Sequence, residues 1–173
     1  MAEHEQTWVT RPDPGGAVGM AGTLLVRVER NTPGRPEFGR VEEQQHRNLV
    51  VNAGQNFLAQ YISSWAIGAN SQMVAMGVGT STTAASLNQT TILGEVKRLA
   101  FSSTSVGANS WSAVTTFGGG SDGLTNVWIS EVAVANTVNS GGGTLLNRIV
   151  INSFTLQSSD IAQLQVIVAC GSR

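Results

Sequence analysis

The sequence predicts an all-β fold: an antiparallel β-sandwich or jelly-roll-like body with one helix and an extended N-terminal arm. Short apolar runs rich in β-branched and aromatic residues recur along the chain, and such residues suit a pleated, half-buried surface. Turns rich in Gly, Ser and Asn separate these runs. Only one stretch has helical periodicity, so the alternating strand–helix units of a parallel sheet are not expected.

Charges and prolines divide the chain into two parts. All four prolines lie within the first 36 residues, and only eight charged residues follow position 50. An ordinary soluble domain has roughly 25% charged residues, so the later part is unusually neutral. We therefore predict an extended N-terminal arm with one strand at residues 1–47 and a β-sandwich body at residues 48–173.

Residues 1–22 begin the predicted arm. Their prolines and glycines disfavour a regular helix or a central strand. A disordered tail and an arm that becomes ordered on a neighbouring subunit are both open interpretations. Trp8 and Val9 point to the second, because a purely solvating tail rarely contains tryptophan.

Residues 23–29 alternate as a half-buried strand does. Leu24, Val26 and Val28 face one way, and polar residues share the other face with Leu25. Since this strand lies within the predicted arm, we expect Leu24 and Val26 to act together with Trp8 and Val9 as assembly contacts.

The segment after this strand is expected to be a turn followed by a solvated face. Residues 31–39 contain Pro-Gly and Asn, which are typical of turns. Glu42, Glu43 and His46 form a small cluster of possible metal ligands, but a metal site needs three or four convergent ligands. We expect a solvated face here, and no metal or other cofactor anywhere in the chain.

The single predicted helix runs over residues 52–65. Asn52 can cap it, and Gln55 stands at the position that completes a capping box. Apolar residues then recur at helical spacing and are expected to pack on the sheet; they are Phe57, Leu58, Tyr61, Ile62 and Trp65.

Strands are expected from residue 73 to the end of the chain. The predicted runs are 73–78, with a turn at 79–83, then 92–101, 110–117, a hairpin over 127–151 continued at 154–156, and a last strand over 162–168. In the last strand Ala162, Leu164, Val166 and Val168 alternate with Gln163, Gln165 and Ile167.

The hairpin at 127–151 is the most strongly patterned stretch. Two apolar runs flank a loop at 136–143 that is rich in residues tolerating positive φ. If the strands pair symmetrically about this loop, Glu131 lies opposite Arg148 as a framework ion pair. The first strand has apolar residues on both faces, which predicts that it is covered on both sides.

Few residues suggest catalysis. Both histidines, His4 and His46, precede the body, so the body alone cannot form a His-based triad. Two of the body acids Glu95, Asp122, Glu131 and Asp160 could form a glycosidase pair, but structural roles are the stronger interpretation. The lone Cys170 is expected to be a small buried residue near the end of a strand. We predict no enzymatic activity.

The overall charge and the apolar runs limit the partners. A net charge of -1 provides no field that would attract nucleic acid or an anionic membrane. No apolar run reaches the roughly 18 residues that span a bilayer. The first ten residues are polar and acidic, unlike a secretion signal, which predicts synthesis in the cytoplasm.

Five motifs in the body occur in a recognisable order. They are NLVVNAG at 48–54, MGVGTST at 76–82, LGEVKR at 93–98, WISEVAVAN at 128–136 and GGTLLNRIVI at 142–151. In this order they resemble a β-sandwich domain of the structural proteins of tailed bacteriophages. The resemblance implies a virion component in which Gly77 and Gly79 shape a turn, while Glu95, Arg98, Glu131 and Arg148 are framework charges.

We therefore expect a non-enzymatic virion structural protein, formed in the cytoplasm of a bacterial host and assembled as a homo-oligomer of three copies with other virion proteins. A capsid decoration or cement role is favoured because the chain is short, and its arm would tether it to neighbouring subunits. A tail-fibre, baseplate or other tail attachment protein is the first alternative. A carbohydrate-binding module that uses Trp111 or Trp128 as a stacking platform is the second.

Overall fold

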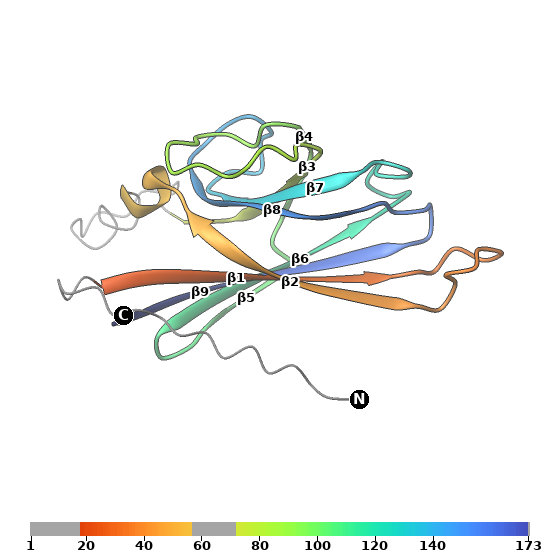
Figure 1. Cartoon of the computed structure of the whole chain (residues 1–173), viewed down its shortest axis with the longest axis horizontal. Coiled ribbons are helices and arrows are strands. Elements are labelled where there is room, and N and C mark those ends of the chain that lie inside the picture. The colour runs from red at the N-terminus through yellow and green to blue at the C-terminus, as the bar shows by residue number, and fades with distance from the viewer. Residues whose placement is uncertain (1–17, 57–71, 173) are drawn as a thin grey trace.

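A computed structural model describes residues 18–56 and 72–172 of the chain. The described residues contain nine strands and one helical turn, at 52–56 (Figure 1). All strand pairs are antiparallel. The prediction of an all-β sandwich is therefore confirmed. The strands are β1 (Val18–Glu29), β2 (Val41–Val50), β3 (Ala75–Gly79), β4 (Glu95–Ala100), β5 (Ser103–Val106), β6 (Ser110–Gly118), β7 (Ile129–Ala135), β8 (Leu145–Phe154) and β9 (Ile161–Ser172).

The strands form two layers that share β2. The order is β4-β3-β7-β8-β2-β1-β9-β6-β5. We call β2-β1-β9-β6-β5 the five-stranded sheet and β4-β3-β7-β8 the four-stranded sheet. β2 pairs with β1 over residues 41–48 but with β8 only through Leu49 and Val50, so it passes from one layer to the other (Figure 1).

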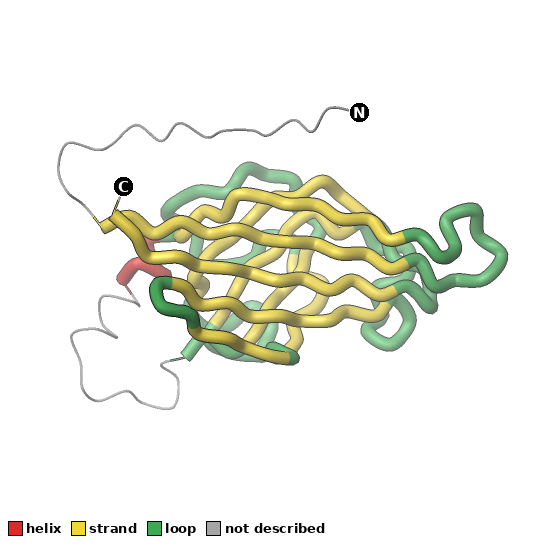
Figure 2. Tube along the Cα trace, turned by 90° about the horizontal axis from the view of Figure 1, so that it is seen from below, coloured by secondary structure: helices red, strands yellow, loops and turns green. Residues whose placement is uncertain are grey.

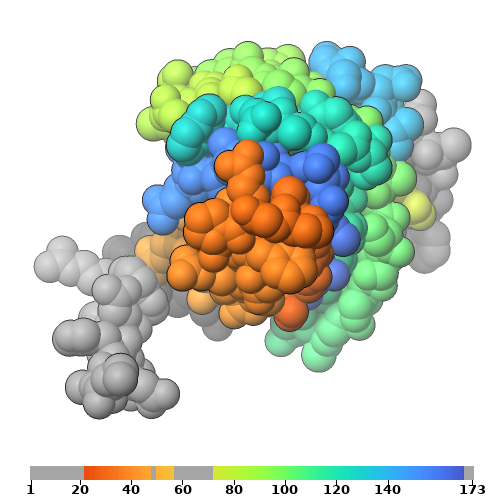
Figure 3. Space-filling model, turned by 90° about the vertical axis from the view of Figure 1, so that its right-hand side faces the viewer, coloured from red at the N-terminus to blue at the C-terminus, as the bar shows by residue number. Residues whose placement is uncertain are grey.

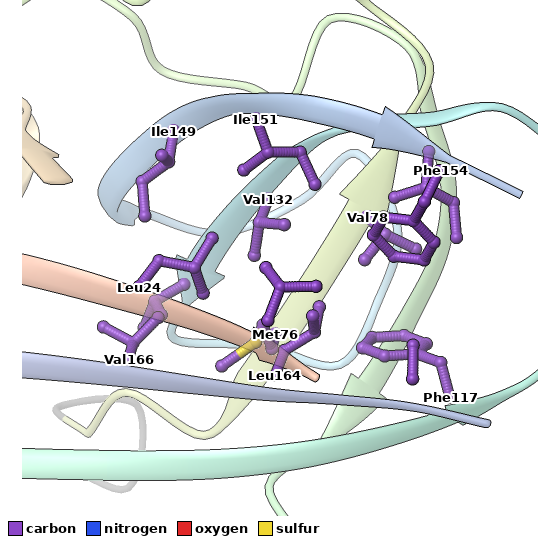
Figure 4. Packing of buried hydrophobic residues seen from close by; sticks show 14 of the residues in the cluster. Leu24, Met76, Val78, Phe117, Val132, Ile149, Ile151, Phe154, Leu164 and Val166 are labelled. Carbon is purple, nitrogen blue, oxygen red and sulfur yellow. The ribbon is translucent and has the colours of Figure 1, made fainter. Parts of the chain in front are cut away.

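The core lies between the two sheets, where alternate residues of the strands meet. From the five-stranded sheet come Leu24 and Leu164, and from the four-stranded sheet come Met76 and Val132, all fully buried (Figure 4). In the last strand Ala162, Leu164, Val166 and Val168 face this core and Gln163 is exposed, so its predicted alternation is confirmed. Phe117 and Phe154 complete one end of the cluster.

The predicted boundary at residue 47 is wrong. β1 is an interior strand that pairs with β2 on one side and β9 on the other, so residues 18–47 belong to the sandwich. Leu24 and Val26 are 0% and 1% exposed, and they are core residues rather than contacts of an arm. Within the described residues, the charges that suggested a separate arm lie on β1, on the hairpin loop that follows it and on β2. Trp8 and Val9 lie outside the described residues.

The sequence analysis did not recognise β2 as a strand. Among the described residues, the edge of β2 over 41–48 that faces away from β1 has no partner strand. Charged side chains such as Glu42 and Glu43 are common on such edges, because they oppose pairing with other chains. The expected solvated character holds, since Val41, Glu43 and Gln45 are exposed.

The helix begins at Asn52, as predicted. Gln55 N–H donates to the carbonyl of Val51 at 3.0 Å, which closes the first turn. The Asn52 side chain does not cap this turn but donates to Asn88 Oδ1 at 2.9 Å. The predicted apolar stripe from Phe57 to Trp65 lies outside the described residues.

Candidate functional site

Glu131 and Arg148 form an ion pair that is fully enclosed by the fold. Arg148 Nε donates to Glu131 Oε2 at 2.5 Å, and both side chains are 0% exposed. Glu131 extends from β7 on the face opposite Val132 and Val134, which belong to the core between the sheets. All seven residues of β7 are buried, as expected for a strand covered on both faces.

The register of this hairpin differs from the symmetric one. Val150 lies opposite Glu131, and Ala133 lies opposite Arg148. The pairing around Glu131 is thus offset by two residues from the symmetric register, and it is irregular between Val134 and Ala135 and between Ile129 and Glu131. The pair forms nevertheless, because the long arginine side chain reaches diagonally across the ladder.

Loop 80–94 covers this ion pair on the outer face of the four-stranded sheet. Glu131 accepts hydrogen bonds from the backbone N–H groups of Ser81 and Gly94, at 3.2 and 2.6 Å. Arg148 Nη1 donates to the carbonyl of Thr83 at 2.9 Å. Beside these contacts lies a second, smaller apolar cluster of Val51, Ile92, Ala133, Ala135 and Leu145.

Gly77 and Gly79 lie inside β3 rather than in the turn that the motif resemblance implied. Both are buried beneath loop 80–94 and the side chains that hold it. A Cβ atom on Gly77 would meet the side chain of Ile92, and one on Gly79 would meet Glu131 and the backbone of Gly94. These positions need glycine because the covering loop approaches the strand closely.

A second ion pair fixes loop 136–144. Arg98 and Glu95 pair in a bidentate manner, with N–O distances of 2.6 and 2.9 Å. Arg98 Nη1 donates to the carbonyl of Gly142 at 2.8 Å, and Glu95 accepts from Gly141 N–H at 2.8 Å. Planar guanidinium and carboxylate groups thus hold the loop by its backbone.

A third cluster fixes the β1–β2 hairpin loop, which forms one end of the molecule (Figure 3). Asp160, 1% exposed, accepts from Asn31 N–H at 2.9 Å and from Gln157 N–H at 3.0 Å. Arg30 lies between Asp160 and Glu42, at 3.3 and 2.8 Å from their carboxylates. The hydrogen bonds that Arg30 donates to Glu42 are the largest influence on the guanidinium and raise the pKa of Arg30 above its ordinary value.

Asp160 is held in its charged form. Burial alone would raise the pKa of this carboxyl, but hydrogen bonds from Gln157, Arg30, Thr32 and Asn31 outweigh burial, and the pKa lies below its ordinary value of 3.8. The stabilisation from this carboxylate is therefore complete above pH 3.8 and is lost as the pH falls through the lower, folded-state pKa.

We expect Asp160→Asn to lower the free energy of unfolding by roughly 1–2 kcal/mol at pH 7, because several backbone donors lose a charged acceptor. The difference from the wild-type chain should shrink below pH 3.8. Urea unfolding of both proteins at a series of pH values between neutrality and strong acid measures it. A difference in the free energy of unfolding that does not change with pH would contradict the conclusion that Asp160 is held in its charged form.

The four acids of the body each have their own basic partner. Asp122 lies 3.5 Å from Lys97 and accepts from Gly118 N–H at 2.7 Å; the other three are the carboxylates described above. Each carboxylate binds backbone N–H groups or a cation, and such contacts support the fold as expected of framework charges. The described residues contain no group of three or more metal-ligating side chains.

Partial burial lowers the pKa of His46, whose Nε2 atom lies at hydrogen-bond distance, 2.9 Å, from Gln44 Oε1.

The outer face of the five-stranded sheet is open. Figure 2 shows this face toward the viewer, and no described loop crosses it. An open groove of about 430 Å³ runs over β9, β1 and β2; it is lined by Leu25, Val26, Arg27, Glu43, Gln44, Gln45, Gln163 and Gln165. The outer faces of the two sheets therefore differ in how far they are covered, because loops 80–94 and 136–144 are held over the outer face of the four-stranded sheet.

The two tryptophans proposed as stacking platforms have different environments. Trp111 packs against the core and meets Phe101 edge-on, with ring centroids 5.6 Å apart. Trp128 precedes β7 and is 65% exposed. Only Trp128 is therefore presented to a ligand.

No protein-family model, no curated protein and no solved structure matches this chain. The part of the chain that the structure describes has no helix long and apolar enough to cross a membrane.

Sequence reasoning found Glu131 and Arg148 but not the cluster around Asp160. Arg30 and Asp160 are separated by 130 residues, and no local pattern links them. The one available signal was that both residues stand at the ends of predicted strands, where turns need fixed acceptors.

Proposed function

We propose that this chain is a non-enzymatic structural protein of a tailed-bacteriophage virion, with capsid decoration as the favoured role and tail or baseplate attachment as the alternative. It self-associates and contacts other virion proteins, and neither nucleic acid nor a membrane is a partner. The observation that carries the assembly role is a difference between the two sheets: ion pairs hold loops over the four-stranded sheet, whereas β5, β6 and β9 of the five-stranded sheet contain no charged residue.

The outer face of the five-stranded sheet is suited to burial in an assembly. Burying the part of this face over β5, β6 and β9 desolvates no charged side chain, and charges are the groups most costly to remove from water. Protein interfaces are likewise depleted in charged residues at their centre. The assignment to a tailed-phage virion rests on the five sequence motifs given above, and the fold is compatible with it.

Particle loading tests this proposal. Full-length protein and a variant that lacks residues 1–17 are each added to particles produced without the gene. A deletion must stop at residue 17, because residues 18–22 pair with β9. We expect the full-length chain to sediment with the particles and the truncated chain to fold but to load poorly.

Two results count against this proposal. Failure of the full-length chain to join particles would refute the virion role. Normal loading of the truncated chain would refute tethering through Trp8 and Val9 and leave the sandwich as the attachment site.

A carbohydrate-binding module is kept as the second candidate because Trp128 is 65% exposed. Exposed aromatic rings stack on the apolar faces of sugars. Binding on a glycan array that disappears in Trp128→Ala would favour this function, and a blank array would remove it.

A further inference from the structure

We propose that the outer face of the five-stranded sheet packs against the same face of a second copy of this chain, across a two-fold axis. This inference rests on the proposed assembly role and names its surface and its partner. Four observations support it: the composition of the face, its charge balance, its size and the chemistry of its amides.

At the centre of the face, aliphatic side chains surround one side-chain amide, that of Gln165. Gln165 on β9 lies between Leu25 on β1 and Val114 on β6. Ile167 follows two residues along the same strand, on the same face. Leu25, Val114, Gln165 and Ile167 are all only partly exposed. An apolar centre surrounded by polar groups is the usual anatomy of a protein interface.

The charges on this face are balanced and lie on one side. β5, β6 and β9 contain no charged residue. On β1 and β2 the outward charges are those of Arg27, Glu29, Glu43 and Arg47, two of each sign. Arg27 already lies 3.2 Å from Glu29. The charges that a second copy brings against this face therefore sum to zero. Like charges facing each other across the contact would cost several kcal/mol.

The face is large enough for a stable dimer. Five strands about 4.8 Å apart, with an average length of roughly nine residues at about 3.3 Å each, cover on the order of 700 Å². A standard interface buries about 800 Å² on each partner. An area of about 700 Å² lies within the range of about 600–1,000 Å² per partner that standard interfaces cover, so the face formed by the described strands is large enough.

The amides make the surface complementary to itself. Gln45, Gln163 and Gln165 line the groove, and each side-chain amide carries a donor and an acceptor. Two carboxamides that face each other across a two-fold axis can exchange N–H···O bonds. The groove over β9 and β1 gives such side chains room to enter.

Light scattering on the full chain tests the pairing. We expect a mass of two chains for the wild type, in place of the three copies expected from the sequence. Gln165→Arg places two like charges close to the two-fold axis, and we expect the dimer to dissociate about a hundredfold more readily. Gln163→Arg, at an exposed neighbouring position, should act in the same direction and is a second variant if the first folds poorly.

Ser140→Arg is the matched control, because this exposed residue lies in loop 136–144 over the other sheet and makes the same change in charge. We expect it to remain a dimer. Urea unfolding at low protein concentration shows whether each variant keeps the fold.

Several results would overturn the pairing. A monomeric wild type or a wild type of three chains would do so, since a two-fold contact closes at two. An undiminished dimer in both glutamine variants would exclude this face. Particle loading remains a separate measurement, so a monomer that still loads refutes the pairing and not the virion role.

Discussion

Arg148→Ala should lower the free energy of unfolding by about 3–5 kcal/mol. The substitution leaves the carboxylate of Glu131 enclosed without its cation, and it removes the bonds from Arg148 to loop 80–94. Loss of that loop would also expose the small cluster around Ile92 and Ala133. Urea unfolding followed by circular dichroism measures the change.

Lys97→Ala is the matched control, because Lys97 pairs with Asp122 at 3.5 Å, belongs to β4 of the four-stranded sheet and has a side chain that is 31% exposed. Exposed pairs contribute about 0–1 kcal/mol. If Arg148→Ala were no more harmful than this control, the enclosed pair would not be what holds the loop.

A double variant separates charge from packing. In Glu131→Gln with Arg148→Met, neither buried charge is left uncompensated, and both side chains keep much of their volume. Replacing both members of a buried pair is often tolerated where removing one is not. We expect the double variant to unfold at higher urea than Arg148→Ala.

Gly79→Ala should lower the free energy of unfolding by about 2–3 kcal/mol. The new methyl group would meet both Glu131 Oε1 and the backbone carbonyl of Gly94. Overpacking at such a site costs about 1–3 kcal/mol, and a displaced hydrogen bond to Glu131 adds to it. The carboxylate and the loop backbone are each held by other contacts, so neither moves aside easily.

Gly142→Ala is the comparison for that substitution. A Cβ atom there would have only ordinary contacts, at 3.6 and 3.8 Å, and its backbone φ is not in the left-handed region. We expect a change within about 0.5 kcal/mol. Equal effects at the two glycines would mean that loop 80–94 yields easily to the strand below it.

The Arg148→Ala substitution also bears on assembly. If the loop anchors serve only to cover the four-stranded sheet, Arg148→Ala weakens the fold without changing the open face of the other sheet. Under conditions where the variant is folded, its mass by light scattering should therefore equal that of the wild type.

The alternation of core-facing and outward residues along the strands could be predicted from the sequence, because it depends on neighbouring residues. Leu24, Val26 and Val28 alternate with outward residues of β1, and Leu164 and Val166 do so in β9. A side-chain period of two, combined with burial of one face, leaves a local pattern. The start of the helix at Asn52 is local in the same sense.

The two strands that were missed lack this pattern. β5 is short and all four of its residues are exposed, so no apolar period marks it. β2 has charged and amide residues on both faces, because most of its length is a sheet edge. Both strands form because a neighbouring strand offers backbone groups for pairing.

Patterns in the sequence were enough to predict the all-β class, the core-facing alternation and the pairing of Glu131 with Arg148, although the symmetric register behind that last prediction is not the observed one. The position of residues 18–47 inside the sandwich, the register of the β7–β8 hairpin and the Arg30–Asp160 cluster depend on the folded chain. The physical reason is distance along the sequence. Hydrophobic periodicity arises within a few residues, whereas a buried charge finds its partner only after folding has brought remote segments together, 130 residues apart in the case of Asp160.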